Sequence, residues 1–366
     1  MRYTHTMCAN RIIDTSIHQW TLDYEQMAEL VPEKWRQKLA IKAKVQDPTA
    51  GTLMASLPWY HATWNEDNPD YDRSESGEYT NSKQYRSPEA IDQYLGEQEI
   101  DVGVLNGHEI TFLPTLMSQD FTAVVASTYN EMVKTDWLST TDRLRGAVAL
   151  PMNNPEAAVH EIQTYADDSD MVTGLVFGGW DLPLGHDYFD PIYEAAEAAG
   201  MPLTVHSSGN PMHRQTAQGL PQQFATYDAN LTQNLMTNLV SMVYQGVFDD
   251  YPDLEVVWTG GGISWILQTL WRCTRYYRNF EPQVPAVLDV EPHEYLERNL
   301  YVSTYPLEAL DEDTLARLCE MVGTDRVLYG SGYPHWNSDG TDILHRLGEE
   351  ERERIFHRNA QRVYGV

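Results

Sequence analysis

The sequence predicts an α/β protein of the (β/α)8 TIM-barrel class, with a long insertion after the first strand. Beyond residue 84, short segments rich in β-branched residues alternate with segments whose apolar residues have helical spacing. With the segment near the N-terminus, eight strand-like segments are present, which is the pattern of a barrel of eight strands and eight helices. An open doubly wound sheet is the alternative, but no glycine-rich phosphate fingerprint follows the first strand.

Each expected strand is short and most follow a turn signal. The strands are expected at residues 11–15, 101–106, 144–150, 172–179, 202–207, 254–260, 300–306 and 326–332. Helical patterns lie between them: residues 155–166 repeat apolar side chains every three or four positions, and residues 190–200 end in Gly200, which suits a helix C-cap. We therefore expect one barrel domain over residues 1–366.

Residues 46–84 form the long polar insertion. A loop of this length is typically a lid, a partner contact or a disordered segment. Its aromatic residues, Trp59, Tyr60 and Trp64, favour a packed lid, which would lie over the C-terminal face of the barrel because it follows the first strand. A second long loop, residues 207–223, follows the fifth strand on the same face.

The strongest compositional signal is charge. The chain has 54 acidic and 25 basic residues, a formal net charge of −29, with the acidic residues spread along its length. Such a surface repels nucleic acid and anionic lipid, so we expect neither as a partner. Excess acid with few lysines resembles the proteins of salt-accumulating halophiles, in which salt screens the self-repulsion. An acidic protein of an ordinary mesophile is the alternative.

The cysteines and the N-terminus indicate a cellular compartment. Cys8, Cys273 and Cys319 are odd in number and widely spaced, as is typical of reduced structural thiols. Residues 1–11 lack the apolar core of a signal peptide, and no apolar run approaches the length of a membrane span. We expect a cytoplasmic protein.

Functional groups of a barrel come from the C-terminal ends of its strands. His18 follows the first strand and His206 ends the fifth, so two imidazoles should face one cavity. Neutral imidazole is the commonest ligand of zinc-like metals. The eighth strand opens into a loop that looks built to present a functional group, yet it presents Gly332.

Several longer segments resemble one family. They are residues 142–162, 184–209, 261–272, 326–336 and 353–366, and they occur in the family's order. The chain resembles the amidohydrolase-related family, in the branch that includes aminocarboxymuconate-semialdehyde decarboxylase. The resemblance covers nearly the whole chain and implies a metal-dependent hydrolase or carboxy-lyase barrel.

The resemblance also implies one divalent, zinc-like metal. Relatives hold it with a His-x-His on strand one, a His on strand five and an Asp on strand eight, and a His or Glu on strand six assists. Here the first position is Ser16 and the strand-eight position is Gly332, while His18 and His206 remain. The strand-six position falls on Thr259 or Gly260. The site is therefore expected to be degenerate, with either no cofactor or one weakly held metal.

Other residues could complete or replace this site. A third metal ligand could come from Asp14, His335, His213 or Asp339, and His206 and His335 are the candidate catalytic groups. His18 and His206 could equally be vestigial core histidines, and His335 a loop anchor. A pocket could be lined by Ser16, Trp64, Thr259, Trp265, Gly332 and Tyr333.

Three functions follow from this interpretation. The first is a non-catalytic or altered subunit, a pseudoenzyme in a homo-oligomer or in a hetero-oligomer with an active paralogue. The second is an active hydrolase or decarboxylase of a small carboxylate, with a rebuilt site around His18 and His206. The third is a metal-free protein that binds a small molecule.

Overall fold

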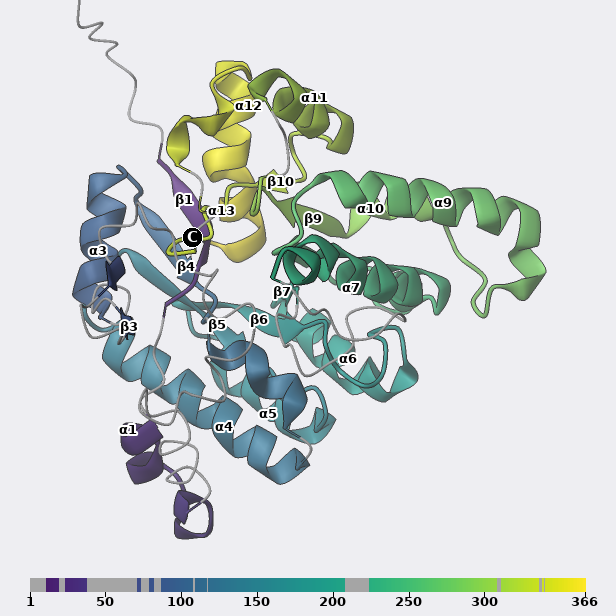
Figure 1. Cartoon of the computed structure of the whole chain (residues 1–366). Coiled ribbons are helices and arrows are strands. Elements are labelled where there is room, and N and C mark those ends of the chain that lie inside the picture. The colour runs from purple at the N-terminus through teal and green to yellow at the C-terminus, as the bar shows by residue number, and fades with distance from the viewer. Residues whose placement is uncertain are drawn as a thin grey trace, which may run out of the picture.

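Eight parallel strands form a barrel in the computed structural model of the chain (Figure 1). The structure describes residues 11–19, 24–37, 71–73, 79–81, 87–107, 109–116, 118–207, 224–307, 311–335, 338 and 340–366. The strands, in their order around the sheet, are β1 (Ile13–Ile17), β4 (Val102–Leu105), β5 (Leu144–Ala149), β6 (Met171–Phe177), β7 (Leu203–His206), β8 (Val256–Thr259), β9 (Leu300–Ser303) and β10 (Val327–Leu328).

The barrel closes between its first strand and the residue after its last. The backbone N–H and the hydroxyl of Thr15 both donate to the carbonyl of Tyr329, at 2.9 and 2.7 Å. The predicted barrel fold is thus confirmed. The eighth strand, Val327–Leu328, is shorter than the expected residues 326–332, and the chain turns farther on at Gly332, whose φ of +73° lies outside the range of a strand.

Helices surround the strands (Figure 1). They are α1 (Tyr24–Leu30), α3 (Pro88–Glu97), α4 (Gln119–Met132), α5 (Pro155–Tyr165), α6 (Asp190–Ala199), α7 (Phe224–Tyr244), α8 (Val247–Asp250), α9 (Ser264–Phe280), α10 (Tyr295–Arg298), α11 (Glu312–Val322), α12 (Glu349–Glu353) and α13 (Asn359–Tyr364). As expected, Gly200 caps α6 in the left-handed conformation. No helix in the described part of the chain combines the length and apolar character that crossing a membrane requires.

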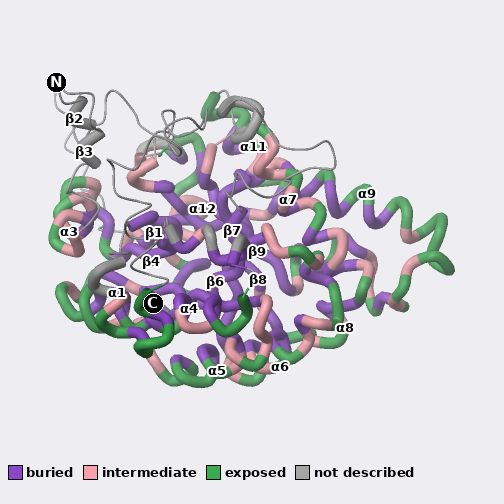
Figure 2. The backbone as a smooth tube through the Cα atoms, turned by 60° about the horizontal axis from the view of Figure 1, so that its bottom comes forward, coloured by how far each residue is buried: buried purple, intermediate pink, exposed green. Residues whose placement is uncertain are grey.

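The strands are buried almost throughout, and Figure 2 shows them as the buried centre of the molecule. Strands covered on one side by helices and on the other by the barrel interior need apolar or small side chains on both faces. Within the insertion, β2 (Tyr71–Arg73) and β3 (Tyr79–Asn81) pair as a short antiparallel hairpin. The remainder of residues 46–84, including Trp64, lies outside the described residues, so the lid stays a prediction.

Asn130 joins α4 to the barrel wall. Its side-chain oxygen accepts from the N–H of Ala149 at 2.8 Å, and its amide donates to the carbonyl of Ala149 and to Glu161 Oε2, at 3.2 and 2.8 Å. Replacement by alanine leaves a buried N–H and a buried carboxylate without these bonds. We expect Asn130→Ala to lower the free energy of unfolding by about 2–3 kcal/mol in denaturant titrations, whereas the exposed Asn279→Ala should change it by under about 0.5 kcal/mol.

Candidate functional site

Three imidazoles meet at the C-terminal end of the barrel. The ring of His18, just after β1, lies edge-on to the ring of His206 with 4.9 Å between centroids. The ring of His335, in the loop after β10, lies 4.5 Å from that of His18. The structure thus brings together His18 and His206, which were expected to face one cavity, and His335, one of several candidates for a third ligand.

His206 is a neutral imidazole with one nitrogen unused. Its Nδ1 lies 2.7 Å from the carbonyl oxygen of Ser207, which can only accept, so Nδ1 carries the proton. Its Nε2 is buried and makes no hydrogen bond. Burial lowers the pKa of His206 to about 4, because the charged imidazolium would lose its hydration. A lone pair is therefore available inside the barrel near neutral pH.

The Nε2 atom of His18 lies in a short polar chain formed by small hydroxyl groups. It lies 3.1 Å from Ser16 Oγ, and the Thr259 hydroxyl in turn points at Ser16 Oγ from 3.4 Å. All three residues are buried. Ser16 and Thr259 therefore supply hydroxyls to one another and to His18 at positions where the resemblance implied metal-binding groups.

Asp14 lies one pleat deeper on β1 and connects it to the loop after β10. Its Oδ1 accepts from the backbone N–H groups of Ser16 and Ser331, at 2.9 and 3.0 Å. Its Oδ2 is buried without a hydrogen-bond partner. Burial raises the pKa of Asp14 to about 6, although the hydrogen bonds from Ser331 and Ser16 oppose the shift.

The space beside Gly332 is occupied by the ring of Tyr305. A Cβ built on Gly332 would lie 1.8 Å from Tyr305 Cε2, far inside van der Waals contact. The same ring lies nearly parallel to that of His335, with 5.9 Å between centroids. Sequence reasoning missed Tyr305, which lies two residues after β9. The only sequence signal for this contact is that a large residue follows one expected strand while a glycine ends the neighbouring one.

The glycine run after β8 makes no free anion-binding loop. The N–H groups of Gly260 and Gly262 both donate to the carbonyl of Tyr305, at 3.2 Å each. A Cβ on Gly260 would lie 2.4 Å from Ser207 Oγ, so this turn has no room for a side chain while Ser207 keeps its place. The backbone of the turn therefore holds Tyr305 in position.

The residues expected to line a pocket lie in different surroundings. Trp265 is buried, donates its indole N–H to the carbonyl of Gly262 at 3.0 Å, and lies edge-on to Trp258. Tyr333 is half-buried and stacks on Tyr94 of α3 with 3.5 Å between ring centroids. Trp64, His213 and Asp339, expected for the pocket or as ligands, lie outside the described residues.

The described side chains do not by themselves form a three-ligand metal site. A catalytic zinc-type site normally has three protein ligands. Among the described residues, no group of three or more His, Cys, Asp or Glu side chains is arranged to hold a metal ion. His206 Nε2 is the one imidazole nitrogen that this part of the chain leaves buried and unpartnered near the cluster.

The fold and the histidines gathered at the strand ends put the candidate site on the C-terminal face of a (β/α)8 barrel. Residues 109–366 match the family model described as amidohydrolase, and the chain belongs to this family.

Its relatives include decarboxylases. The chain is 25% identical over 311 residues to the gamma-resorcylate decarboxylase of Polaromonas sp., which covers 76% of this chain and 90% of the relative. It is 24% identical over 252 residues to the 2-amino-3-carboxymuconate-6-semialdehyde decarboxylase of Dictyostelium discoideum, with 68% and 66% covered. The resemblance predicted from sequence motifs is thus confirmed.

Solved structures share the fold. An amidohydrolase from Mycobacterium avium subsp. paratuberculosis superposes with a TM-score of 0.71 at 20% identity, over 97% of this chain and 99% of that chain. The 5-carboxyvanillate decarboxylase of Novosphingobium aromaticivorans, solved with manganese, superposes with a TM-score of 0.70 at 17% identity, over 97% and 96%. The described residues therefore share the barrel fold of these structures.

Proposed function

We propose that this chain is an altered, non-catalytic member of the amidohydrolase-fold decarboxylases, which acts as the partner subunit of an active paralogue. The observation that carries the proposal is the packing of Tyr305 against Gly332. The ring occupies the room that any side chain at position 332 would need. The relatives' strand-eight carboxylate, implied for this position by resemblance, is therefore not merely deleted but excluded by a neighbour.

Two further features support a changed site. Ser16 and Thr259 provide hydroxyls in place of stronger ligands, and the hydroxyl of Ser16 is in contact with His18. The backbone N–H groups after β8 are used on Tyr305, so they offer no binding site to a substrate carboxylate. The frame of the barrel is complete while its polar groups are largely directed at one another.

The test measures metal content and decarboxylation together. The chain is purified in high salt without chelator, and its metal content is measured by elemental mass spectrometry beside a His18→Ala/His206→Ala variant. Release of CO2 is followed with gamma-resorcylate and 5-carboxyvanillate, the compounds named for the relatives, with and without added Mn²⁺. We expect no metal above the level of the variant and no turnover. Near-stoichiometric metal that the variant loses, together with turnover, would overturn the proposal.

The partner role needs its own measurement. We expect the tagged chain, recovered from its native cells in high salt, to bring down a family member that retains both strand-one histidines and the strand-eight aspartate. Adding the purified chain should then raise the stability or the activity of that paralogue. This role would be contradicted if adding the chain changed neither the activity nor the melting temperature of the paralogue.

A second candidate rests on the unused Nε2 of His206. With the rings of His18 and His335 close by, an active decarboxylase of a small carboxylate with a rebuilt site is the competing function, its third group being His335 or Asp14. The His335→Ala and Asp14→Asn variants separate the two functions. Loss of metal or turnover in either variant favours the rebuilt site.

A further inference from the structure

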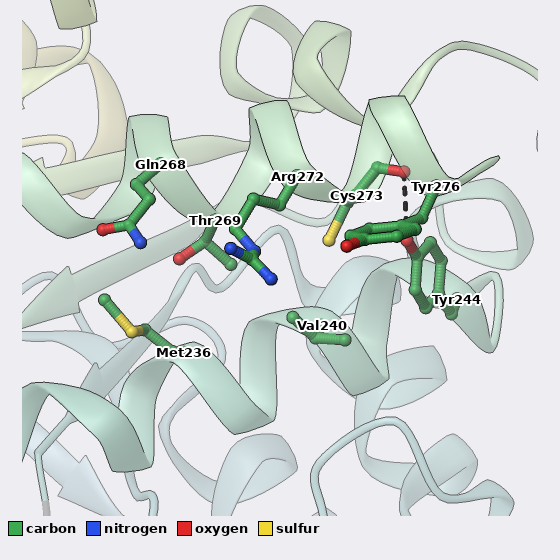
Figure 3. A pocket seen from close by; sticks show the side chains of 8 residues that line it. All are labelled: Met236, Val240, Tyr244, Gln268, Thr269, Arg272, Cys273 and Tyr276. Carbon is green, nitrogen blue, oxygen red and sulfur yellow. Dashed lines mark hydrogen bonds between the residues drawn. The ribbon is translucent and has the colours of Figure 1, made fainter. Parts of the chain in front are cut away.

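A groove between α7 and α9 shares no residue with the histidine cluster at the C-terminal end of the barrel (Figure 3). Its volume is about 300 Å³, and Figure 1 shows α9 extending outward from the barrel beside α7. From α7 the groove is lined by Met236, Val240 and Tyr244, and the residues that line it from α9 include Gln268, Arg272 and Tyr276.

Acidic residues are nearly absent from these two helices. The 21 residues of α7 include one, Asp228, and the 17 residues of α9 include none but carry three arginines. At the chain's frequency of 54 acidic residues in 366, the two helices together would be expected to carry five to six. None of the residues that line the groove is acidic. Because a chain of net charge −29 repels anions over most of its surface, the groove is a place where an anion approaches at low cost.

Two hydrogen-bond donors of α9 are directed at the groove. Gln268 and Arg272 are four residues apart, so they lie on one face of the helix, one turn from each other. Figure 3 shows the amide and the guanidinium pointing from α9 toward Met236 and Val240 of α7. Within the described residues, Arg272 forms no ion pair and the side chain of Gln268 makes no hydrogen bond. Both groups are therefore available to a ligand.

The rest of the groove combines apolar and aromatic groups without a negative charge. Met236 and Val240 are half-buried and present a thioether and methyl groups. The guanidinium of Arg272 lies over the ring of Tyr276, 5.8 Å from its centroid, so the cation adjoins an aromatic surface. Burial raises the pKa of the Cys273 thiol to about 11, so this lining residue is uncharged near neutral pH.

We infer that the α7–α9 groove binds a small aromatic carboxylate. The carboxylate accepts hydrogen bonds from Gln268 and from Arg272, whose planar guanidinium matches two carboxylate oxygens. The ring packs against Tyr276 and the thioether of Met236, because aromatic and sulfur groups attract one another. A volume of about 300 Å³ is at the lower end of the range for ligand pockets, which suits a single ring.

Other classes of ligand fit these groups less well. An organic cation would meet Arg272 and no carboxylate in the lining, and a neutral compound would leave the guanidinium without a counter-charge. The groove is separate from the candidate site of the barrel, so this inference goes beyond the proposed function and does not depend on it.

Titration of the full-length chain with para-fluorobenzoate in high salt, followed by fluorine NMR, tests the inference. We expect saturable binding with a dissociation constant of about 1 mM or below, as suits a ligand of about ten heavy atoms. The neutral para-fluorobenzamide and the cationic para-fluorobenzylamine should bind at least about 10-fold more weakly, because neither carries a charge that pairs with arginine. All titrations are made at one ionic strength, because salt weakens every charge pair.

Variants locate the binding in the groove. Arg272→Gln removes its cation and should weaken the binding of para-fluorobenzoate at least about 10-fold. Arg275→Gln is the matched control, because Arg275 is an exposed arginine of the same helix that does not line the groove. It should bind like the wild type. Val240→Trp fills the groove from α7 and should abolish saturable binding, with far-ultraviolet circular dichroism verifying the fold of each variant.

The His18→Ala/His206→Ala variant distinguishes the groove from the candidate site of the barrel, and it should bind para-fluorobenzoate as the wild type does. Binding that this variant loses while Arg272→Gln or Val240→Trp retains it would overturn the inference, because the ligand would then lie in the barrel. Equal effects of Arg272→Gln and Arg275→Gln would also overturn it. So would the absence of saturable binding, the result expected if another protein chain covers the groove. Metal content and CO2 release, which test the proposed function, do not depend on these results.

Discussion

Replacing Gly332 with alanine should lower the free energy of unfolding by about 2–4 kcal/mol, combining left-handed strain with overpacking. The φ of Gly332 is +73°, a conformation that costs energy for any residue with a Cβ. The added methyl would also lie 1.8 Å from Tyr305 Cε2, and the backbone carbonyl of Tyr305 accepts hydrogen bonds from the N–H groups of Gly260 and Gly262. Denaturant titration of the purified variant in high salt measures the loss.

Two variants separate the strain of the backbone from the clash with the ring. Gly200 has a φ of +60°, but nothing lies within 4 Å of a Cβ added there. Gly200→Ala should therefore lower the free energy of unfolding by only about 1 kcal/mol. In the Tyr305→Ala/Gly332→Ala double variant, the loss should be smaller than the sum of the single losses by at least about 1 kcal/mol. Equal costs at positions 200 and 332, or strict additivity, would show that Tyr305 does not fill this space.

Asp14 and His206 should contribute opposite pH dependences to stability. The pKa of Asp14 is raised from 3.8 to about 6 in the fold. Because the folded protein holds this proton more tightly, the stabilising contribution of Asp14 is fully present below about pH 4 and is lost as the pH rises through about 6, a change of about 3 kcal/mol.

The pKa of His206 is lowered from 6.5 to about 4. Its contribution is therefore fully present above pH 6.5 and is lost as the pH falls through about 4, again a change of about 3 kcal/mol. Between pH 4 and 6.5 the two contributions change with pH in opposite directions and by similar amounts. Together they therefore change the stability of the wild type little over this interval.

Single variants should reveal each slope. Relative to wild type, Asp14→Asn should lose stability as the pH falls from 6.5 to 4, because only the His206 contribution remains. His206→Gln should gain stability relative to wild type over the same interval. Denaturant titrations at constant ionic strength measure the difference in unfolding free energy between each variant and the wild type. The contributions of the many surface carboxylates cancel in these differences, because all three proteins share them. Curves that run parallel to wild type would show that neither group has the expected pKa.

Local sequence patterns were sufficient to predict the barrel and part of its candidate site. The alternation of β-branched and amphipathic segments predicts eight strands and the helices between them, because both periods follow from backbone geometry. The position of His18 and His206 at strand ends follows from the same alternation, since all parallel strands of a barrel end on one face. The structure brings their rings together accordingly.

Tertiary packing decided what those groups can do. Nothing adjacent in the chain indicates that Tyr305, 27 positions before Gly332, fills the space beside it, or that Ser331 donates to Asp14 across the closure of the barrel. Likewise, Nε2 of His206 is the nitrogen without a hydrogen bond because the carbonyl of Ser207 lies on the Nδ1 side of the ring. Sterics, hydrogen bonding and desolvation act between residues that are distant in sequence, so the chemistry of a site, unlike the period of a strand, is set only when the chain has closed on itself.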